Sequence, residues 1–71
     1  MTEKIEIKTP FIKLDSLLKF AGIAETGGIA KEIVIKGKVK VNGEICTQRG
    51  RKIKPGMFVI VDENVLEVIE G

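Results

Sequence analysis

The fold is decided by residues 37–44, which read Gly-Lys-Val-Lys-Val-Asn-Gly-Glu. Lysine and valine alternate over residues 38–41, so a strand of period two sends the two lysines to one face and the two valines to the other. Asn42-Gly43 follows at once and suits the two left-handed positions of a type I′ turn. Gly37 stands just before, where a helix ends in a left-handed cap. We therefore expect a helix, a strand with a basic outer face and a hairpin, in that order.

The composition predicts one small α+β domain spanning residues 1–71. This length lies near the lower limit at which a hydrophobic core stabilises a fold unaided. Hydrophobic residues make up 44% of the sequence, and most of them are aliphatic. We therefore expect a packed core of isoleucine, valine and leucine side chains.

Charge is distributed unevenly along the sequence, although the net charge is only +2. Residues 13–54 contain ten lysines and arginines against four acidic residues, whereas residues 55–71 contain four acidic residues and no basic one. This asymmetry is typical of a protein that binds a polyanion on one face. The acidic C-terminal face is a candidate site for a protein partner.

The N-terminal half predicts one strand and two short helices. Residues 4–8 alternate charged and apolar side chains, which indicates a half-exposed strand, and Thr9-Pro10 interrupts it. The first helix has Gly22 as its cap and one apolar face, formed by Leu14, Leu17, Leu18 and Ala21. The second helix has Thr26 as its N-cap, ends at Gly37 and buries Ala30, Ile33 and Val34.

The C-terminal half predicts the rest of a mainly antiparallel sheet. In a simple two-residue turn Ile45 faces Lys40, so either a bulge shifts the register or Ile45 is partly exposed. Residues 47–54 are expected to form a loop or a weak edge strand, and Pro55-Gly56 a type II turn. Residues 57–61 and 65–69 are predicted strands, joined by a turn at residues 62–64. The expected architecture is two short helices packed on a small, mainly antiparallel sheet.

These residues occur in a distinctive order: Lys13-Leu14-Asp15, Leu18, Gly22, Ala30, Ile33-Val34, Gly37, Val39, Val41-Asn42-Gly43 and Lys54-Pro55-Gly56. The order resembles the alpha-L RNA-binding domain family, named for ribosomal small-subunit protein S-four, over residues 13 to about 61. The short length and the Glu-Thr-Gly-Gly of residues 25–28 look like the stand-alone YaaA-like bacterial members. The resemblance implies the same two-helix architecture, flanked by strands at 4–8 and 65–69, and structured RNA as the ligand.

One departure from the family concerns the start of the second helix. Many members carry Ser-Arg where this chain has Thr26-Gly27, so a phosphate-contacting arginine is missing. Two glycines would instead let the backbone amides of the helix N-terminus approach a phosphate. We therefore place Thr26 and Gly27 among the candidate RNA-binding residues, beside the alternative that they form only a cap and a tight link.

The other candidate RNA contacts are basic. The preferred phosphate contacts are Lys13, Lys31, Lys36, Lys38 and Lys40, and a second, flexible patch contains Arg49, Arg51 and Lys52. We expect the preferred lysines to converge on one surface that binds ribosomal or other structured RNA. The chain has no Trp or Tyr, and phenylalanines placed in the core would form no stacking platform. We therefore expect RNA to be recognised by its shape.

Nothing in the sequence predicts catalysis, a cofactor or a metal site. No histidine is present, which excludes a Cys–His pair and histidine ligands. Cys46, the one cysteine, falls opposite Val39 in the simple register and is expected to be buried. A lone cysteine, no recognisable leader and no apolar run long enough for a membrane span predict a cytoplasmic protein.

Two alternatives remain at the level of the sequence. The segments Val41-Asn42-Gly43-Glu44 and 54–59, with Gly71, also look like the β-grasp sulfur carriers, which form a thiocarboxylate on a Gly-Gly tail. Here Glu70 stands in place of the penultimate glycine. A protein–protein adaptor that uses the acidic face at residues 62–70 is the second alternative.

Overall fold

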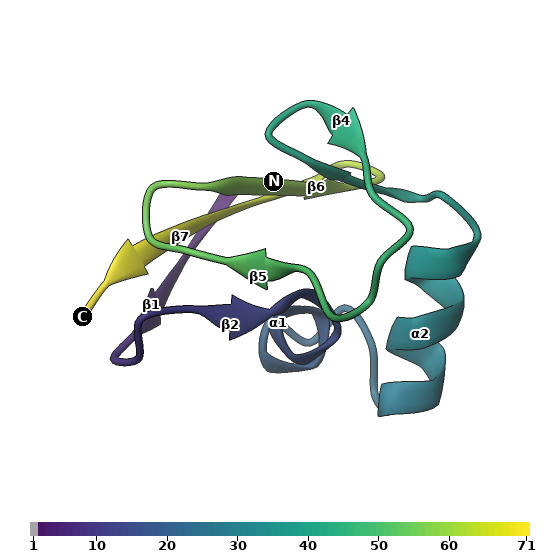
Figure 1. The fold of residues 1–71 in the computed structure, drawn as a ribbon, viewed down its shortest axis with the longest axis horizontal. Coiled ribbons are helices and arrows are strands. Elements are labelled where there is room, and N and C mark those ends of the chain that lie inside the picture. The colour runs from purple at the N-terminus through teal and green to yellow at the C-terminus, as the bar shows by residue number, and fades with distance from the viewer. Residues whose placement is uncertain (1) are drawn as a thin grey trace.

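A computed structural model describes residues 2–71; Met1, part of the predicted domain, lies outside the described residues. The strands and helices form two layers (Figure 1). In chain order they are β1 (Thr2–Ile7), β2 (Ile12–Lys13), α1 (Leu14–Phe20), α2 (Gly27–Ile35), β3 (Val39–Val41), β4 (Glu44–Ile45), β5 (Lys52–Ile53), β6 (Phe58–Val61) and β7 (Asn64–Glu70).

The larger layer is a five-stranded sheet of order β1-β7-β6-β3-β4. Its pairs are antiparallel except for β1 with β7, which run parallel from Thr2 opposite Val65 to Ile7 opposite Glu70. This arrangement confirms the expected α+β class with a mainly antiparallel sheet. A separate two-stranded ribbon pairs β2 with β5, so the segment 47–54, predicted as a loop or a weak edge strand, contains one short strand.

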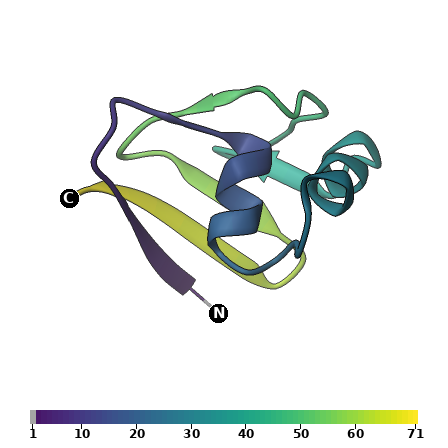
Figure 2. The ribbon, with the colours of Figure 1, turned by 90° about the horizontal axis from the view of Figure 1, so that it is seen from below.

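Both helices end in the way their glycines predict. Gly22 and Gly37 have φ of +78° and +73° and follow α1 and α2 as left-handed caps. Each cap has the two hydrogen bonds of a Schellman motif; after α2 they run from Gly37 N–H to Val34 C=O and from Lys38 N–H to Ile33 C=O. The caps end both helices within three turns. The two short helices cross at a steep angle (Figure 2).

The hairpin between β3 and β4 resolves the question of register. Asn42 and Gly43 have φ of +51° and +90°, as a two-residue type I′ turn requires. Lys40 pairs with Ile45 without a bulge, and the Ile45 side chain is 63% exposed. The Asn42 Oδ1 accepts a hydrogen bond from the Phe58 N–H at 2.9 Å, which ties the turn to β6.

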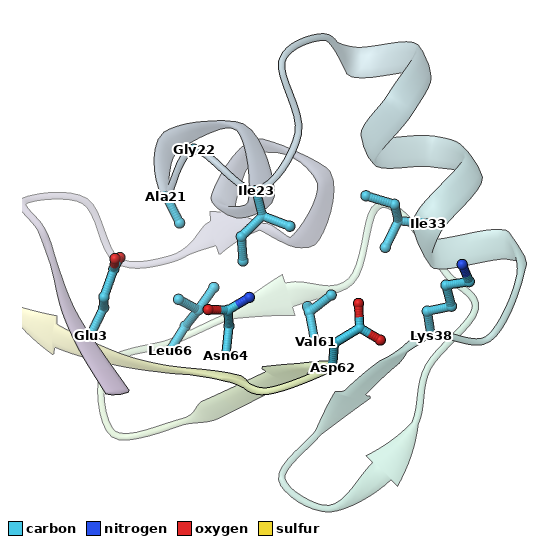
Figure 3. A pocket seen from close by; sticks show the side chains of 10 residues that line it. All are labelled: Glu3, Ala21, Gly22, Ile23, Ile33, Lys38, Val61, Asp62, Asn64 and Leu66. Carbon is cyan, nitrogen blue, oxygen red and sulfur yellow. The ribbon is translucent and has the colours of Figure 1, made fainter. Parts of the chain in front are cut away.

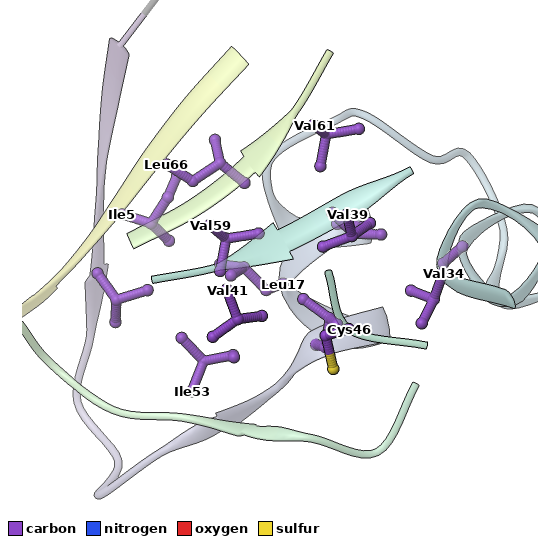
Figure 4. Close-up of a cluster of buried hydrophobic side chains, with 14 of the residues drawn as sticks. Ile5, Leu17, Val34, Val39, Val41, Cys46, Ile53, Val59, Val61 and Leu66 are labelled. Atoms are coloured by element: carbon purple, nitrogen blue, oxygen red, sulfur yellow. The ribbon is translucent and has the colours of Figure 1, made fainter. Parts of the chain in front are cut away.

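The hydrophobic core lies between the sheet and the helix layer (Figure 4). Leu14, Leu17 and Leu18 of α1 are fully buried, as the helical spacing predicts. Cys46 is buried at 7% exposure, and its N–H donates to the Val39 carbonyl at 2.9 Å, as the simple register predicts. Among residues 2–71, no helix combines the length and apolar character that a membrane crossing needs.

Two of the three phenylalanines lie outside the core, so the condition under which they would form no stacking platform does not hold for these two. Phe20 is 66% exposed because it lies on α1 outside the apolar face that its leucines form. Phe58 is 42% exposed because it points away from the helices, in alternation with the buried Val59 of β6. Phe11 is half-buried.

Candidate nucleic-acid interface

The ten candidate RNA-binding residues are all exposed in the structure, but they lie in three separate places. The first surrounds the start of α1, the second is the N-terminal turn of α2, and the third extends from the end of α2 into β3. The first place contains the largest number of cations.

Four cations gather around the first turn of α1; we call Lys13, Arg49, Arg51 and Lys52 the basic rim. Lys13 and Lys52 are direct partners in the ribbon of β2 and β5, so their side chains share one face. The loop before β5 is fastened to the helix, because the N–H groups of Leu14 and Asp15 donate to the carbonyls of Arg51 and Arg49 at 2.9 and 3.0 Å. The sequence predicts Lys13 in one patch and the other three in a flexible second patch; the structure instead unites them.

Local contacts hold the rim in shape. The Arg51 N–H donates to the Gln48 carbonyl at 3.1 Å and closes a turn through Arg49. The Lys52 ammonium lies 4.9 Å from the centre of the Phe11 ring, a cation–π distance. Two lysines directly opposite one another across a ladder repel, so the rim has a stability cost that a bound anion would remove.

The N-terminal turn of α2 is built as the sequence predicts. The Thr26 Oγ1 accepts a hydrogen bond from the Ile29 N–H at 3.2 Å and caps the helix. A side chain at Gly27 would meet no atom within 4 Å, and the first turn holds no acidic residue. Lys31 stands one turn further along the helix. This end of α2 therefore offers an open approach that no carboxylate of its own turn opposes.

The third place does not form the convergent lysine surface that the sequence predicts. Lys36 caps the C-terminus of α2, and Lys38 and Lys40 line a shallow depression of about 240 Å³ together with Asp62. Lys38 lies just before β3, and Asp62, which lies just after the partner strand β6, lines the same depression. Lys40 points away from the helix layer, because its neighbours Val39 and Val41 point into the core. The basic rim and Lys40 therefore face different sides of the molecule.

The sequence shows the components of the rim but no signal that joins them. β2 and β5 are only two residues each and lie far apart in the sequence, so neither has a periodicity that can be read. The ring of Phe11 beside Lys52 was likewise not anticipated. The useful signal in the sequence is the density of basic residues at 49–52, which predicts a cationic segment without placing it.

Within residues 2–71, no three side chains of the metal-ligating types lie together in a way that would hold an ion. In the same residues every buried side-chain nitrogen and oxygen has a hydrogen-bond partner. What the rim offers chemically is attraction for an anion by exposed lysine and arginine side chains.

Known proteins resemble this chain over most of its length. YbcJ of Escherichia coli (strain K12) is 36% identical over 62 residues, which cover 87% of this chain and 89% of that protein. The solution structure of YbcJ matches this chain with a TM-score of 0.72 and 33% identity. The match covers 93% of this chain and 85% of the YbcJ chain, and that structure is described as revealing an alfaL motif involved in RNA binding. The "Probable ribosome maturation protein RlbA" of Bacillus subtilis (strain 168) is 37% identical over 62 residues, 87% of either chain.

The sequence also matches the family model of the S4 domain over residues 5–69, nearly the whole of the described chain. The match begins in β1 and ends in β7, so it includes the parallel strand pair as well as the two helices and the hairpin. This extent, the shared architecture and the identity to relatives of similar length lead to one conclusion: the chain belongs to the S4 domain family.

Proposed function

We propose that this protein is a non-catalytic RNA-binding protein that contacts the phosphates of structured ribosomal RNA during ribosome maturation. The relatives support the general class, because one is described by an RNA-binding motif and another is named for ribosome maturation. In this proposal the protein binds RNA in the cytoplasm. The basic rim supplies the main contacts in this proposal, the N-terminal turn of α2 adds to them, and Lys36, Lys38 and Lys40 play a lesser part.

The observation that carries the proposal is the pairing of Lys13 with Lys52 beside Arg49 and Arg51. Two segments far apart in the sequence, β2 and residues 49–52, bring these cations together, and hydrogen bonds of the backbone keep them there. Such an arrangement is costly for a surface without a ligand, since like charges across a ladder destabilise the fold. A phosphate backbone brings the matching negative charges at a short repeat.

The β-grasp alternative conflicts with the position of Gly71. Its N–H donates to the Ile7 carbonyl at 2.9 Å, so this glycine is held beside β1 at the end of β7. A sulfur carrier needs its terminal glycine on a free tail that enters a partner enzyme. RNA binding, by contrast, does not require Gly71 to lie on a free tail.

The dependence of RNA affinity on salt tests the proposal. If four to six phosphates are engaged, a plot of log Kobs against log salt concentration has a slope of about −3 to −5, taking the single-strand and duplex coefficients as bounds. The measurement is a filter-binding or fluorescence-anisotropy titration with a fragment of folded ribosomal RNA. A slope near zero, or no binding at 50 mM salt, would contradict the proposal.

A paired substitution separates the strand lysines from the rim. We expect Lys38→Gln with Lys40→Gln to weaken RNA binding no more than about eightfold at 0.1 M salt, the loss of one phosphate contact. The reason is that neither lysine belongs to the basic rim and that Lys40 points away from the helix layer. A loss above about 50-fold in the same titration would instead make the strand face the main site.

A further inference from the structure

A groove of about 480 Å³ that the proposed function does not use lies on the side of the molecule where the tip of the β6–β7 hairpin meets the two helices (Figure 3). The link after α1 and one side of α2 form one wall, through Ala21, Ile23 and Ile33. The ends of β6 and β7 form the other wall. None of the basic-rim residues lines it.

The floor of the groove is apolar and only partly covered. Ala21, Ile23 and Ile33 are half-buried side chains that pack on the edge of the core, and the buried Val61 and Leu66 continue the surface below them. Figure 3 shows Ile23 and Ile33 pointing from the helix layer toward Leu66 and Val61 across the opening. Because Val61 and Leu66 are only 2% and 1% exposed, an aliphatic side chain of a partner would make its apolar contacts mainly with the helix wall.

The border of the groove is polar and carries more negative than positive charge. Glu3 stands at one end, Asn64 lies between, and the Asp62 carboxylate points into the opening (Figure 3). Lys38, at the end near α2, is the one cation in this lining. A phosphate backbone is disfavoured here because two carboxylates would repel it, whereas a cationic chain would be attracted.

We propose that this groove docks a basic peptide segment that inserts one aliphatic side chain between the helix layer and β6–β7, flanked by lysines or arginines that face Glu3 and Asp62. The negative charge at the border of the groove favours the basic flanks of the peptide, and the apolar floor favours the aliphatic side chain between them. The sequence predicts a protein partner at the acidic C-terminal face. The present proposal places that partner in one groove and gives it one chemistry, a basic segment with one aliphatic side chain. Because no basic-rim residue lines the groove, and Lys38 is the one minor RNA contact there, a bound basic partner leaves the main RNA contacts accessible.

The experiment titrates the ¹⁵N-labelled protein with the capped peptide Gly-Lys-Lys-Leu-Lys-Lys-Gly and follows amide shifts by NMR. We expect shifts confined to residues around the groove, such as Ile23, Ile33 and Asn64, with a dissociation constant on the order of 0.1–1 mM, as suits a small contact area. Replacing the leucine of the peptide by glutamine, or its lysines by glutamate, should abolish the shifts. Shifts that map to other surfaces, or survive the leucine change unaltered, would overturn the proposal.

A matched pair of protein variants tests the role of the carboxylates. Glu3→Gln with Asp62→Asn removes both negative charges, and asparagine tolerates the left-handed φ of +54° at position 62. We expect this variant to bind the peptide about 3- to 10-fold more weakly, the worth of two exposed ion pairs. The control, Glu25→Gln with Glu44→Gln, makes the same charge change at exposed sites outside the groove and should bind as the parent does. Equal weakening in both variants would show general attraction to an acidic protein and contradict docking in the groove.

RNA binding is measured on the same variants. The groove variant should keep the RNA affinity of the parent within about twofold, because neither carboxylate belongs to the basic rim. Peptide docking with no RNA binding would refute the proposed function and leave the groove standing. RNA binding without peptide shifts at millimolar concentration would refute the groove alone.

Discussion

Changing Arg49, Arg51 and Lys52 together to glutamine is expected to weaken binding to ribosomal RNA about 100- to 500-fold at 0.1 M salt, because each lost phosphate contact costs roughly five- to eightfold there. The fold should survive, since all three side chains are exposed and the loop is attached to α1 through backbone carbonyls that the substitution keeps. The salt slope should also become shallower by about 2–3 units. Anisotropy titrations at several salt concentrations measure both effects.

The control for this experiment changes the same number of charges elsewhere. Lys4, Lys8 and Lys54 are exposed and lie outside the three candidate places, and two of them line a depression beside Gly71. Their triple change to glutamine lowers the net charge equally, and we expect it to reduce the affinity less than about fivefold. If both triple variants lose affinity to the same degree, RNA binding depends on overall charge, and the basic rim is not a site.

The second large effect concerns stability. Leu17→Ala removes a fully buried side chain of α1 and is expected to lower the free energy of unfolding by about 2–5 kcal/mol. A domain of this size has roughly 4–10 kcal/mol in total, so the variant should be partly unfolded at 37 °C. Urea titration followed by circular dichroism gives the value.

Phe20→Ala on the same helix is the comparison for Leu17. It removes a larger side chain, but Phe20 is 66% exposed, so we expect a change within about 0.5 kcal/mol. A small effect at Leu17, or a large one at Phe20, would show that α1 packs through a different face from the one described.

The local rules of the sequence predicted the centre of the chain well. Residues 39–45 fold as their alternation and the Asn-Gly pair indicate, because each of those signals acts within a few residues; of the two alternatives at Ile45, the structure has the exposed side chain without a bulge. The glycine caps and the Thr26 cap are local for the same reason.

The candidate site was predicted only in its components. Lys13 meets Lys52 through two-residue strands whose pairing depends on the packed core, and no nearby residue encodes it. The separation of Lys40 from the rim follows from the same alternation that identified Lys40 as exposed, since a residue that points away from the core also points away from the helices. The sign of the charge could therefore be read from the sequence, whereas its location required the three-dimensional fold.

The parallel pairing of β1 with β7 has a consequence for the synthesis of this chain on the ribosome. β1 is translated before the other strands of this sheet, whereas the strand it pairs with in the described residues, β7, comprises residues 64–70. Until β7 is translated, Ile5 and Ile7 have no sheet to cover them, and closing so long a loop is slow compared with forming α1, α2 and the hairpin. β1 therefore stays unpaired on the nascent chain, and the five-stranded sheet forms only after β7 has emerged from the ribosome.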